Sequence, residues 1–115
     1  AYDKRIIAVF QPHLYSRTRI FCNDFAEALS LADEVVVAPI YAAREQPVEG
    51  VSAESLVTLM KQNGFTNVRY APEKGEIAAD LAARISDGDL VLVLGAGDIR
   101  QVSEKLAGLL SRRTN

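Results

Sequence analysis

Hydrophobic and polar positions follow two repeating patterns along the chain. Short runs of aliphatic and β-branched residues, typical of strands buried on both faces, alternate with longer stretches in which apolar residues recur every three or four positions. The strand-like runs are Arg5–Phe10, Glu34–Ile40, Asn67–Ala71 and Leu90–Leu94. The helix-like stretches are 17–32, 52–63, 75–85 and 99–111.

This alternation predicts an α/β fold, because strands joined by helices pair in parallel through crossover connections. With the strands labelled a to d in chain order, we expect a Rossmann-like three-layer αβα domain over residues 1–115. Its sheet is predicted to be mostly parallel, with four strands in the order c-b-a-d. Strands a and d are then neighbours whose helices leave on opposite faces, and ligands bind in the crevice between their carboxyl ends.

Polar residues suggest where two of the helices begin and end. Ser16 is the predicted N-cap of the first helix and Ser52 that of the second, while Gly64 is a natural stop after the second. We expect the first helix to bury one apolar stripe. The stripe consists of Ile20, Phe21, Phe25, Ala28, Leu29 and Ala32.

The turn after the first strand carries the most informative residues. Gln11 and Pro12 are followed by the only histidine, His13, and then by Arg17 and Arg19 at the start of a helix. A cation is unfavourable at the positive end of a helix dipole unless an anion is near, so this turn predicts an anion site. Only one of the two arginines can face the crevice, because residues two positions apart do not share a helix face.

A second turn and a long loop are expected beside the first turn. Gly95 and Gly97 resemble the start of a dinucleotide fingerprint, but Arg100 replaces its third glycine. A tight turn with close packing is therefore favoured over phosphate binding, and Asp98 is predicted either to cap the last helix or to contact a ligand. The loop 41–50 is about twice the usual length, which indicates function. Within it, exposure of Arg44 is favoured over pairing with an acid.

Composition narrows the classes of function. The 115 residues are 49% hydrophobic and 24% charged, enough for one globular domain with a core. The formal net charge of -2 gives no general attraction to nucleic acid or to an anionic membrane, and no apolar run approaches membrane-spanning length. A single cysteine, Cys22, excludes an internal disulfide and suits a packing role. We find no metal-ligand cluster, phosphate-binding loop or nucleophile with a base, and assign no catalytic residue.

Four segments together resemble the Mur ligase family of peptidoglycan synthesis, in the branch that adds L-alanine. Phe10-Gln-Pro-His-Leu-Tyr-Ser-Arg-Thr18 is similar to the family signature Phe-Gln-Pro-His-Arg-Tyr-Thr-Arg-Thr. The other three segments agree in order and spacing. They are Asp24-Phe-Ala26, Tyr41-Ala-Ala-Arg-Glu45 with Pro47 and Gly50, and Leu94-Gly-Ala-Gly-Asp-Ile99.

The resemblance implies a C-terminal domain cut from a longer cytoplasmic bacterial enzyme and lacking the strand and helix that precede it in the family. The implied enzyme joins L-alanine to UDP-N-acetylmuramate in an ATP-dependent reaction through an acyl phosphate. ATP and Mg²⁺ would be bound mainly by the central domain, and the present domain would close the site, so that alone it is expected to be inactive. His13 and Arg17 correspond to residues near the amino acid's carboxylate.

The chain departs from the family pattern in two places, and two other functions remain open. Leu14 stands where an arginine is common, and Ala42 replaces a loop proline. Without the preceding strand, an exposed sheet edge or apolar surface is expected beside the fourth strand. The alternatives are a free-standing Rossmann-like module that binds a nucleotide or anion, and a related ligase that recycles murein peptide.

Overall fold

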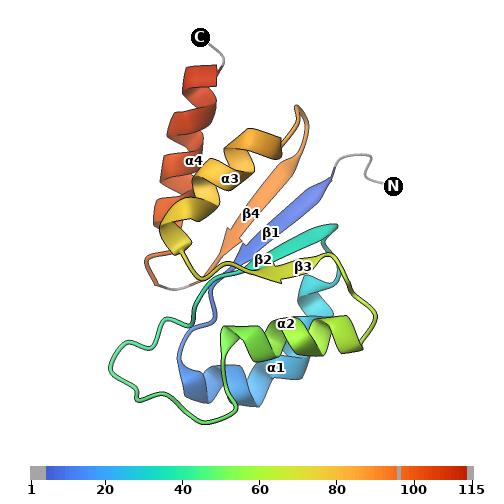
Figure 1. The fold of residues 1–115 in the computed structure, drawn as a ribbon, viewed down its shortest axis with the longest axis vertical. Helices are drawn as coiled ribbons and strands as arrows, with labels where there is room; N and C mark the ends of the chain where they lie inside the picture. The colour runs from blue at the N-terminus through green and yellow to red at the C-terminus, as the bar shows by residue number, and fades with distance from the viewer. Residues whose placement is uncertain (1–4, 96, 114–115) are drawn as a thin grey trace.

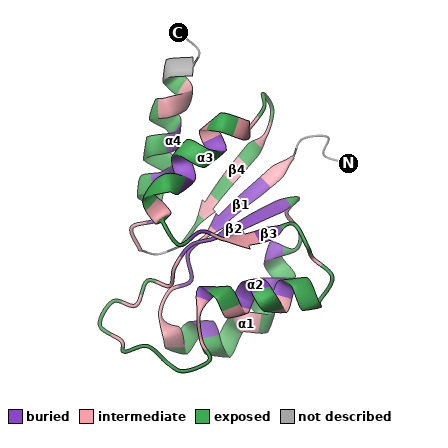
Figure 2. Cartoon of the chain, viewed as in Figure 1, coloured by how far each residue is buried: buried purple, intermediate pink, exposed green. Residues whose placement is uncertain are grey.

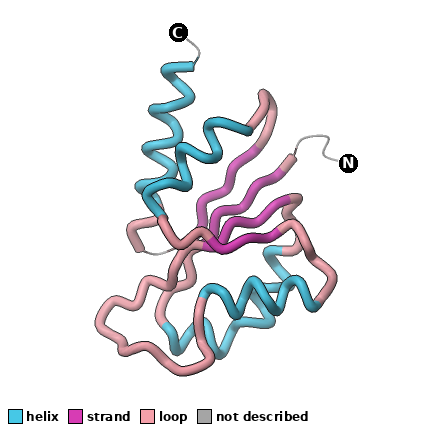
Figure 3. The backbone as a smooth tube through the Cα atoms, in the orientation of Figure 1, coloured by secondary structure: helices cyan, strands magenta, loops and turns pink. Residues whose placement is uncertain are grey.

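Strands and helices alternate along the chain as predicted (Figures 1 and 3). The computed structural model describes residues 5–95 and 97–113. The strands are β1 (Ile6–Phe10), β2 (Glu34–Val37), β3 (Val68–Tyr70) and β4 (Leu90–Leu94). The helices are α1 (Tyr15–Leu29), α2 (Ala53–Gln62), α3 (Ile77–Arg84) and α4 (Arg100–Arg113), with a short 3₁₀ helix, η1 (Lys74–Glu76), directly before α3.

The four strands form one parallel sheet in the order β3-β2-β1-β4. This confirms the predicted order c-b-a-d. In the register of the sheet, Ala8 of β1 lies between Val35 of β2 and Leu92 of β4. The carboxyl ends of β1 and β4 are therefore adjacent, and the turns that follow both strands leave from the same edge of the sheet.

Helices cover both faces of the sheet, with α1 and α2 on one side and α3 and α4 on the other (Figure 1). Since side chains alternate along a strand, Ile7 and Val9 belong to the core under α3 and α4, whereas Ala8 belongs to the core under α1 and α2. Helices α3 and α4 contribute side chains to the first of these cores, and α1 and α2 to the second. The buried helical residues are Ile77, Ala78, Leu81, Val102 and Leu106 on the first side, and Ala26, Leu29, Ala53, Leu56, Val57 and Met60 on the second.

Strand β4 lies at one end of the described sheet and is covered on one face only. Val91 and Val93 pack against the core under α3 and α4. On the opposite face Leu90, Leu92 and Leu94 are 39–41% exposed, and the strand is mostly green and pink in Figure 2. The exposed apolar surface expected beside the fourth strand is therefore present.

The start and the buried face of α1 differ from the prediction. The helix begins at Tyr15 with Leu14 as its N-cap residue, so Ser16 lies in the first turn and is not the cap. The predicted stripe was partly wrong, because Ile20 is 65% exposed and Phe21 and Ala28 are also exposed. The buried face instead includes Thr18, whose hydroxyl donates to the Leu14 carbonyl at 2.8 Å and so satisfies its polar group inside the helix.

Other element ends follow from local chemistry. Ser52 caps α2 as predicted, since its hydroxyl accepts from the Ser55 amide at 3.0 Å. Gly64 has a φ of 95° after the end of this helix, in the role expected of it. Strand β2 ends at Val37 instead of Ile40, because Pro39 has no amide hydrogen for the ladder.

A cluster of ion pairs closes the amino end of the sheet. Glu34 at the start of β2 is 6% exposed, and Arg84 of α3 donates to both of its carboxylate oxygens, one at 2.8 Å. Arg5 lies 3.9 Å from Glu34 and pairs with Asp89 at 2.7 Å. These contacts join residues far apart in sequence, and no local pattern predicted them.

Candidate functional site

The chain continues in parallel beyond the ends of β1 and β2, which brings the loop 41–50 beside the turn after β1. The Tyr41 amide donates to the Pro12 carbonyl at 2.8 Å, and the Leu14 amide donates to the Tyr41 carbonyl at 2.9 Å. These bonds form an isolated parallel bridge between His13 and Tyr41. The sequence placed the loop and the turn side by side, and the structure confirms this arrangement.

The bridge stacks two rings at the mouth of the site. The ring centroids of His13 and Tyr41 are 5.8 Å apart with an interplanar angle of 20°. His13 is half-buried and Tyr41 is 38% exposed, so each ring keeps one part in solvent. The stack packs the imidazole against Tyr41, and imidazole nitrogens can donate to or accept from a ligand.

The positive end of α1 is occupied by a carboxylate of the protein itself. Glu45 in the long loop accepts from the Ser16 hydroxyl at 2.6 Å and from the Ser16 amide at 3.1 Å. These bonds, the hydroxyl foremost, hold the pKa of Glu45 below its usual value. The loop thus supplies an anion to the helix start, which explains part of the anion preference predicted there.

Close packing explains both glycines of the turn after β4. The backbone N–H of Gln11 donates to the Leu94 carbonyl at 3.0 Å, so this turn starts directly against the end of β1. A Cβ atom on Gly95, which has a φ of 149°, would lie 3.0 Å from the Gln11 carbonyl oxygen. A Cβ atom on Gly97 would lie 2.6 Å from the Tyr41 ring. The structural role favoured for these glycines is therefore supported.

An open cleft of about 480 Å³ lies where these segments meet, and it is mostly polar. It is lined by Tyr41, Gly95, Gly97, Asp98, Arg100 and Gln101. The carboxylate of Asp98 is not free, since Lys74 of η1 pairs with it and Gln11 donates to it at 3.4 Å. These partners, Lys74 foremost, lower the pKa of Asp98 despite partial desolvation. The Asp98 carboxylate, predicted either to cap the last helix or to contact a ligand, is thus paired within the domain.

The arginines predicted for the site remain exposed. Arg17 lies in the first turn of α1 and Arg44 in the long loop, and Arg19 is exposed as well. Within residues 5–95 and 97–113 none of the three forms an ion pair, as favoured for Arg44. The structure therefore stacks His13 on Tyr41 at the cleft but leaves Arg17 and Arg44 exposed outside the cleft lining.

Three residues of the site were not singled out from the sequence. Gln11 was noted only as part of a turn, Glu45 only as part of a loop, and Lys74 not at all. A polar residue directly after a buried strand was the one available signal for Gln11. Glu45 and Lys74 contact partners 29 and 24 positions away, which local patterns do not report.

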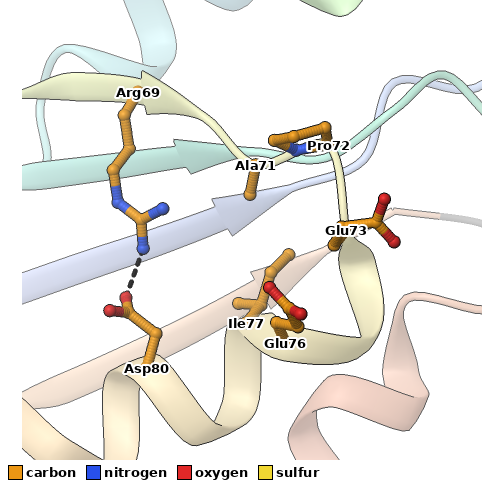
Figure 4. A pocket seen from close by; sticks show the side chains of 7 residues that line it. All are labelled: Arg69, Ala71, Pro72, Glu73, Glu76, Ile77 and Asp80. Carbon is orange, nitrogen blue, oxygen red and sulfur yellow. Dashed lines mark hydrogen bonds and ion pairs between the residues drawn. The ribbon is translucent and has the colours of Figure 1, made fainter.

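A second hollow, of about 180 Å³, lies between the end of β3 and the start of α3 (Figure 4). Its rim carries Glu73, Glu76 and Asp80, and Asp80 pairs with Arg69 across the opening. None of the site residues predicted from the sequence lines it. We therefore place the candidate site at the ends of β1 and β4.

The described residues contain no group of three or more histidine, cysteine, aspartate or glutamate side chains placed to hold a metal ion. In the same part of the chain, no helix combines the length and the apolar character needed to cross a membrane.

Several known proteins to which this chain is similar belong to one family. Residues 1–97 match the family model described as the Mur ligase glutamate ligase domain. UDP-N-acetylmuramate–L-alanine ligases are 45% identical in Salinibacter ruber, over 94% of this chain, and 48% identical in Cutibacterium acnes, over 92%. The corresponding ligase of a Mycobacterium species is 43% identical over the full 115 residues. The chain spans only 22–23% of the length of these relatives.

Solved structures agree on the fold. The UDP-N-acetylmuramate–alanine ligase of Thermotoga maritima superposes with a TM-score of 0.74 and 25% identity, over 96% of this chain and 21% of that one. A ligase domain from Haemophilus ducreyi, at 19% identity and a TM-score of 0.58, shows the same fold over 93% of this chain and 70% of that one. From the family match and these relatives, the chain belongs to the Mur ligase family and corresponds to its C-terminal domain.

Proposed function

We propose that this domain is part of an enzyme that joins L-alanine to UDP-N-acetylmuramate in the bacterial cytoplasm, using ATP. The observation that carries the proposal is the segment Phe10–Thr18, which lies at the switch point of the sheet and places His13 beside the cleft. Alanine ligases from several bacteria are 43–48% identical over nearly the whole chain.

The proposed reaction needs an anion site of the kind that this edge of the sheet offers. ATP transfers its γ-phosphoryl group to the muramoyl carboxylate, and the amine of L-alanine attacks the resulting acyl phosphate and expels phosphate. The alanine carboxylate takes no part in bond formation and must be held while the amine reacts. Arg17, which has no partner among the described residues, and His13 are suited to hold it.

ATP and Mg²⁺ are assigned mainly to other parts of the enzyme. The described residues offer no cluster of ligands for a metal ion, so they do not fit a Mg²⁺ site. The turn at Gly95 and Gly97 is explained by close packing against Gln11 and Tyr41, which gives no independent support for phosphate binding. The role proposed for this domain is to close the site and position the amino acid.

The test of the proposed function uses the full-length ligase. Arg17→Ala is expected to raise the KM for L-alanine far more than the KM for ATP, because it removes a carboxylate contact. Arg19→Ala, two positions along the same exposed helix start, is the matched control and should change neither constant appreciably. A larger effect on ATP would contradict the role of Arg17. Assays with L-alanine, glycine and L-serine would establish the amino-acid preference.

The isolated chain tests the alternative of a free-standing nucleotide- or anion-binding module. Our proposal predicts that ATP titrated into residues 1–115 produces no saturable signal, since the domain acts only opposite the rest of the enzyme. Saturable binding by the isolated chain would favour the free-standing module.

A further inference from the structure

One buried amide connects the exits of three neighbouring strands. Gln11 directly follows β1 and is 3% exposed, although it is polar. Its Nε2 lies 3.4 Å from the Pro39 carbonyl oxygen, in the segment after β2, and 3.4 Å from Oδ1 of Asp98, in the turn after β4. A single side chain therefore contacts both the segment that follows β2 and the turn that follows β4.

The oxygen of the same side-chain amide does not contribute to the stability of the fold. Oε1 of Gln11 is buried and has no hydrogen-bond partner in the part of the chain that the structure describes. Leaving a buried acceptor unpaired costs about 1–3 kcal/mol. A methionine of similar length would avoid this cost and fill the same space. The amide hydrogens toward Pro39 and Asp98 are what a methionine would lose.

Packing fixes the side chain against the cleft. Oε1 would lie 2.8 Å from a Cβ atom on Gly97, and the Tyr41 ring would lie 2.6 Å from the same atom. The Gln11 side-chain amide thus packs closely behind Gly97 and Tyr41. A shift of the amide would move Tyr41 or Gly97, and both of these residues line the cleft.

Asp98 has a second partner at the same carboxylate oxygen, Oδ1. Lys74 at the start of η1 pairs with the carboxylate, and the pKa of Asp98 is lowered, so Asp98 is an ionised acceptor at neutral pH. The connection Lys74–Asp98–Gln11–Pro39 therefore runs from η1 across the turn after β4 to the exit of β2.

We propose that Gln11 is a positioning residue for the ligation reaction. Its amide holds the turn at Gly97 and Asp98 against the segment that begins at Pro39, and so keeps Tyr41 and the stacked His13 in a single arrangement. Gln11 acts through these neighbours and does not itself contact substrate. This inference rests on the proposed function. It adds a buried residue, Gln11, to a site for which His13 and Arg17 were proposed.

The test compares Gln11→Met and Gln11→Glu in the full-length enzyme, with Gln62→Met, an exposed change at the end of α2, as control. Gln11→Met is expected to unfold at the same temperature as wild type or higher, because the unpaired acceptor is gone. Its kcat/KM for L-alanine should nevertheless fall about tenfold or more, because a displaced site loses its alignment. A residue with only a structural role would lose stability and activity together.

Gln11→Glu adds a pH-dependent readout. The new carboxylate would lie beside Asp98 in a buried place, and both effects raise its pKa. When ionised it cannot donate to Asp98 or Pro39, whereas when protonated it can donate to one of them. The activity of the variant relative to wild type should therefore rise as the pH falls, and the Gln62→Met control should show no such trend.

Hydrogen–deuterium exchange separates this inference from the proposed function. In full-length Gln11→Met, peptides covering 39–43 and 97–101 should exchange faster, while peptides covering 53–62 should not change. Unchanged exchange at the first two segments, or activity within about twofold of wild type, would overturn the positioning role. If the wild-type enzyme lacked alanine ligase activity, the proposed function would fail, and exchange would still decide whether Gln11 holds the two segments together.

Discussion

Single residues at the candidate site adopt conformations that their side chains do not favour. Leu14 has a φ of 67° and ψ of 140°, a region that costs a non-glycine residue about 1–3 kcal/mol. The residue is held there because its amide donates to the Tyr41 carbonyl while α1 begins at the next position. The strain therefore comes from joining the long loop to the helix start.

Replacing Leu14 measures this strain. Leu14→Gly is expected to be more stable than Leu14→Ala by about 1 kcal/mol, since glycine tolerates positive φ and the strain relieved exceeds the usual entropic cost of glycine. Chemical denaturation of both variants is the measurement. The matched pair Ser103→Gly and Ser103→Ala, in the exposed interior of α4, should show the opposite order. Equal behaviour at the two positions would refute the assignment of strain.

At the scale of elements, contacts between segments distant in sequence stabilise the ends of helices and strands that nearby residues do not cap. Helix α2 carries its own cap at Ser52, but α1 takes its anion from Glu45 in the loop. The amino end of β2 and the carboxyl end of α3 are likewise joined by the pairing of Glu34 with Arg84. Each contact links an element to a segment far away in sequence.

Glu45→Gln tests the cap supplied by the loop. The pKa of Glu45 is lower in the folded protein than its usual value of 4.5, so its stabilising effect is full above pH 4.5 and is lost as the pH falls through the folded pKa. The variant should therefore melt at a lower temperature than wild type near neutral pH. This difference should shrink in acid, when melting is followed across pH. Glu49→Gln, an exposed change in the same loop, should show no comparable dependence.

Arg84→Met tests the ion pairs at the amino end of the sheet. Among the described residues it leaves the buried Glu34 with only the more distant Arg5, and we expect a loss of about 2–4 kcal/mol in the free energy of unfolding. Arg69→Met removes an exposed pair with Asp80 and should cost less than about 1 kcal/mol. Similar losses for the two variants in urea denaturation would show that burial of Glu34 does not matter.

At the scale of the whole molecule, one face of the sheet is only partly covered. Leu90, Leu92 and Leu94 are exposed on β4, and Leu31 beside them is 86% exposed. A shallow groove of about 250 Å³, lined in part by Leu31, Leu92 and Leu94, is almost entirely apolar. Apolar surface beside a strand edge favours association between molecules.

The isolated chain 1–115 is therefore expected to self-associate weakly or to be marginally stable. Sedimentation at increasing concentration should show association that Leu92→Lys reduces, because the lysine charges this face of β4. Lys61→Glu, an exposed change in the last turn of α2, is the control and should leave association unchanged. A monomer at all concentrations with a high unfolding midpoint would contradict the expectation.

The agreement between prediction and structure depends on how local the signal is. Strand order followed from the Rossmann-like arrangement that the alternating elements suggested, and Ser52 and Gly64 were placed correctly because caps depend on neighbouring residues. The buried stripe of α1 was wrong at Ile20, since which face is buried depends on what the helix packs against. The start of α1 was misplaced for a similar reason, because its cap comes from a distant loop.

The sequence by itself determined the fold class, the order of the strands and the family, and it predicted the edge of the sheet at which the candidate site is placed. These properties depend on periodicity and on short motifs, which involve residues close together in sequence. The tertiary structure decided that Glu45 takes the start of α1, that Asp98 is held by Lys74 and Gln11, and that β4 leaves one face exposed. Such contacts arise only when segments distant in sequence meet, because hydrogen bonds, ion pairs and burial depend on positions in space.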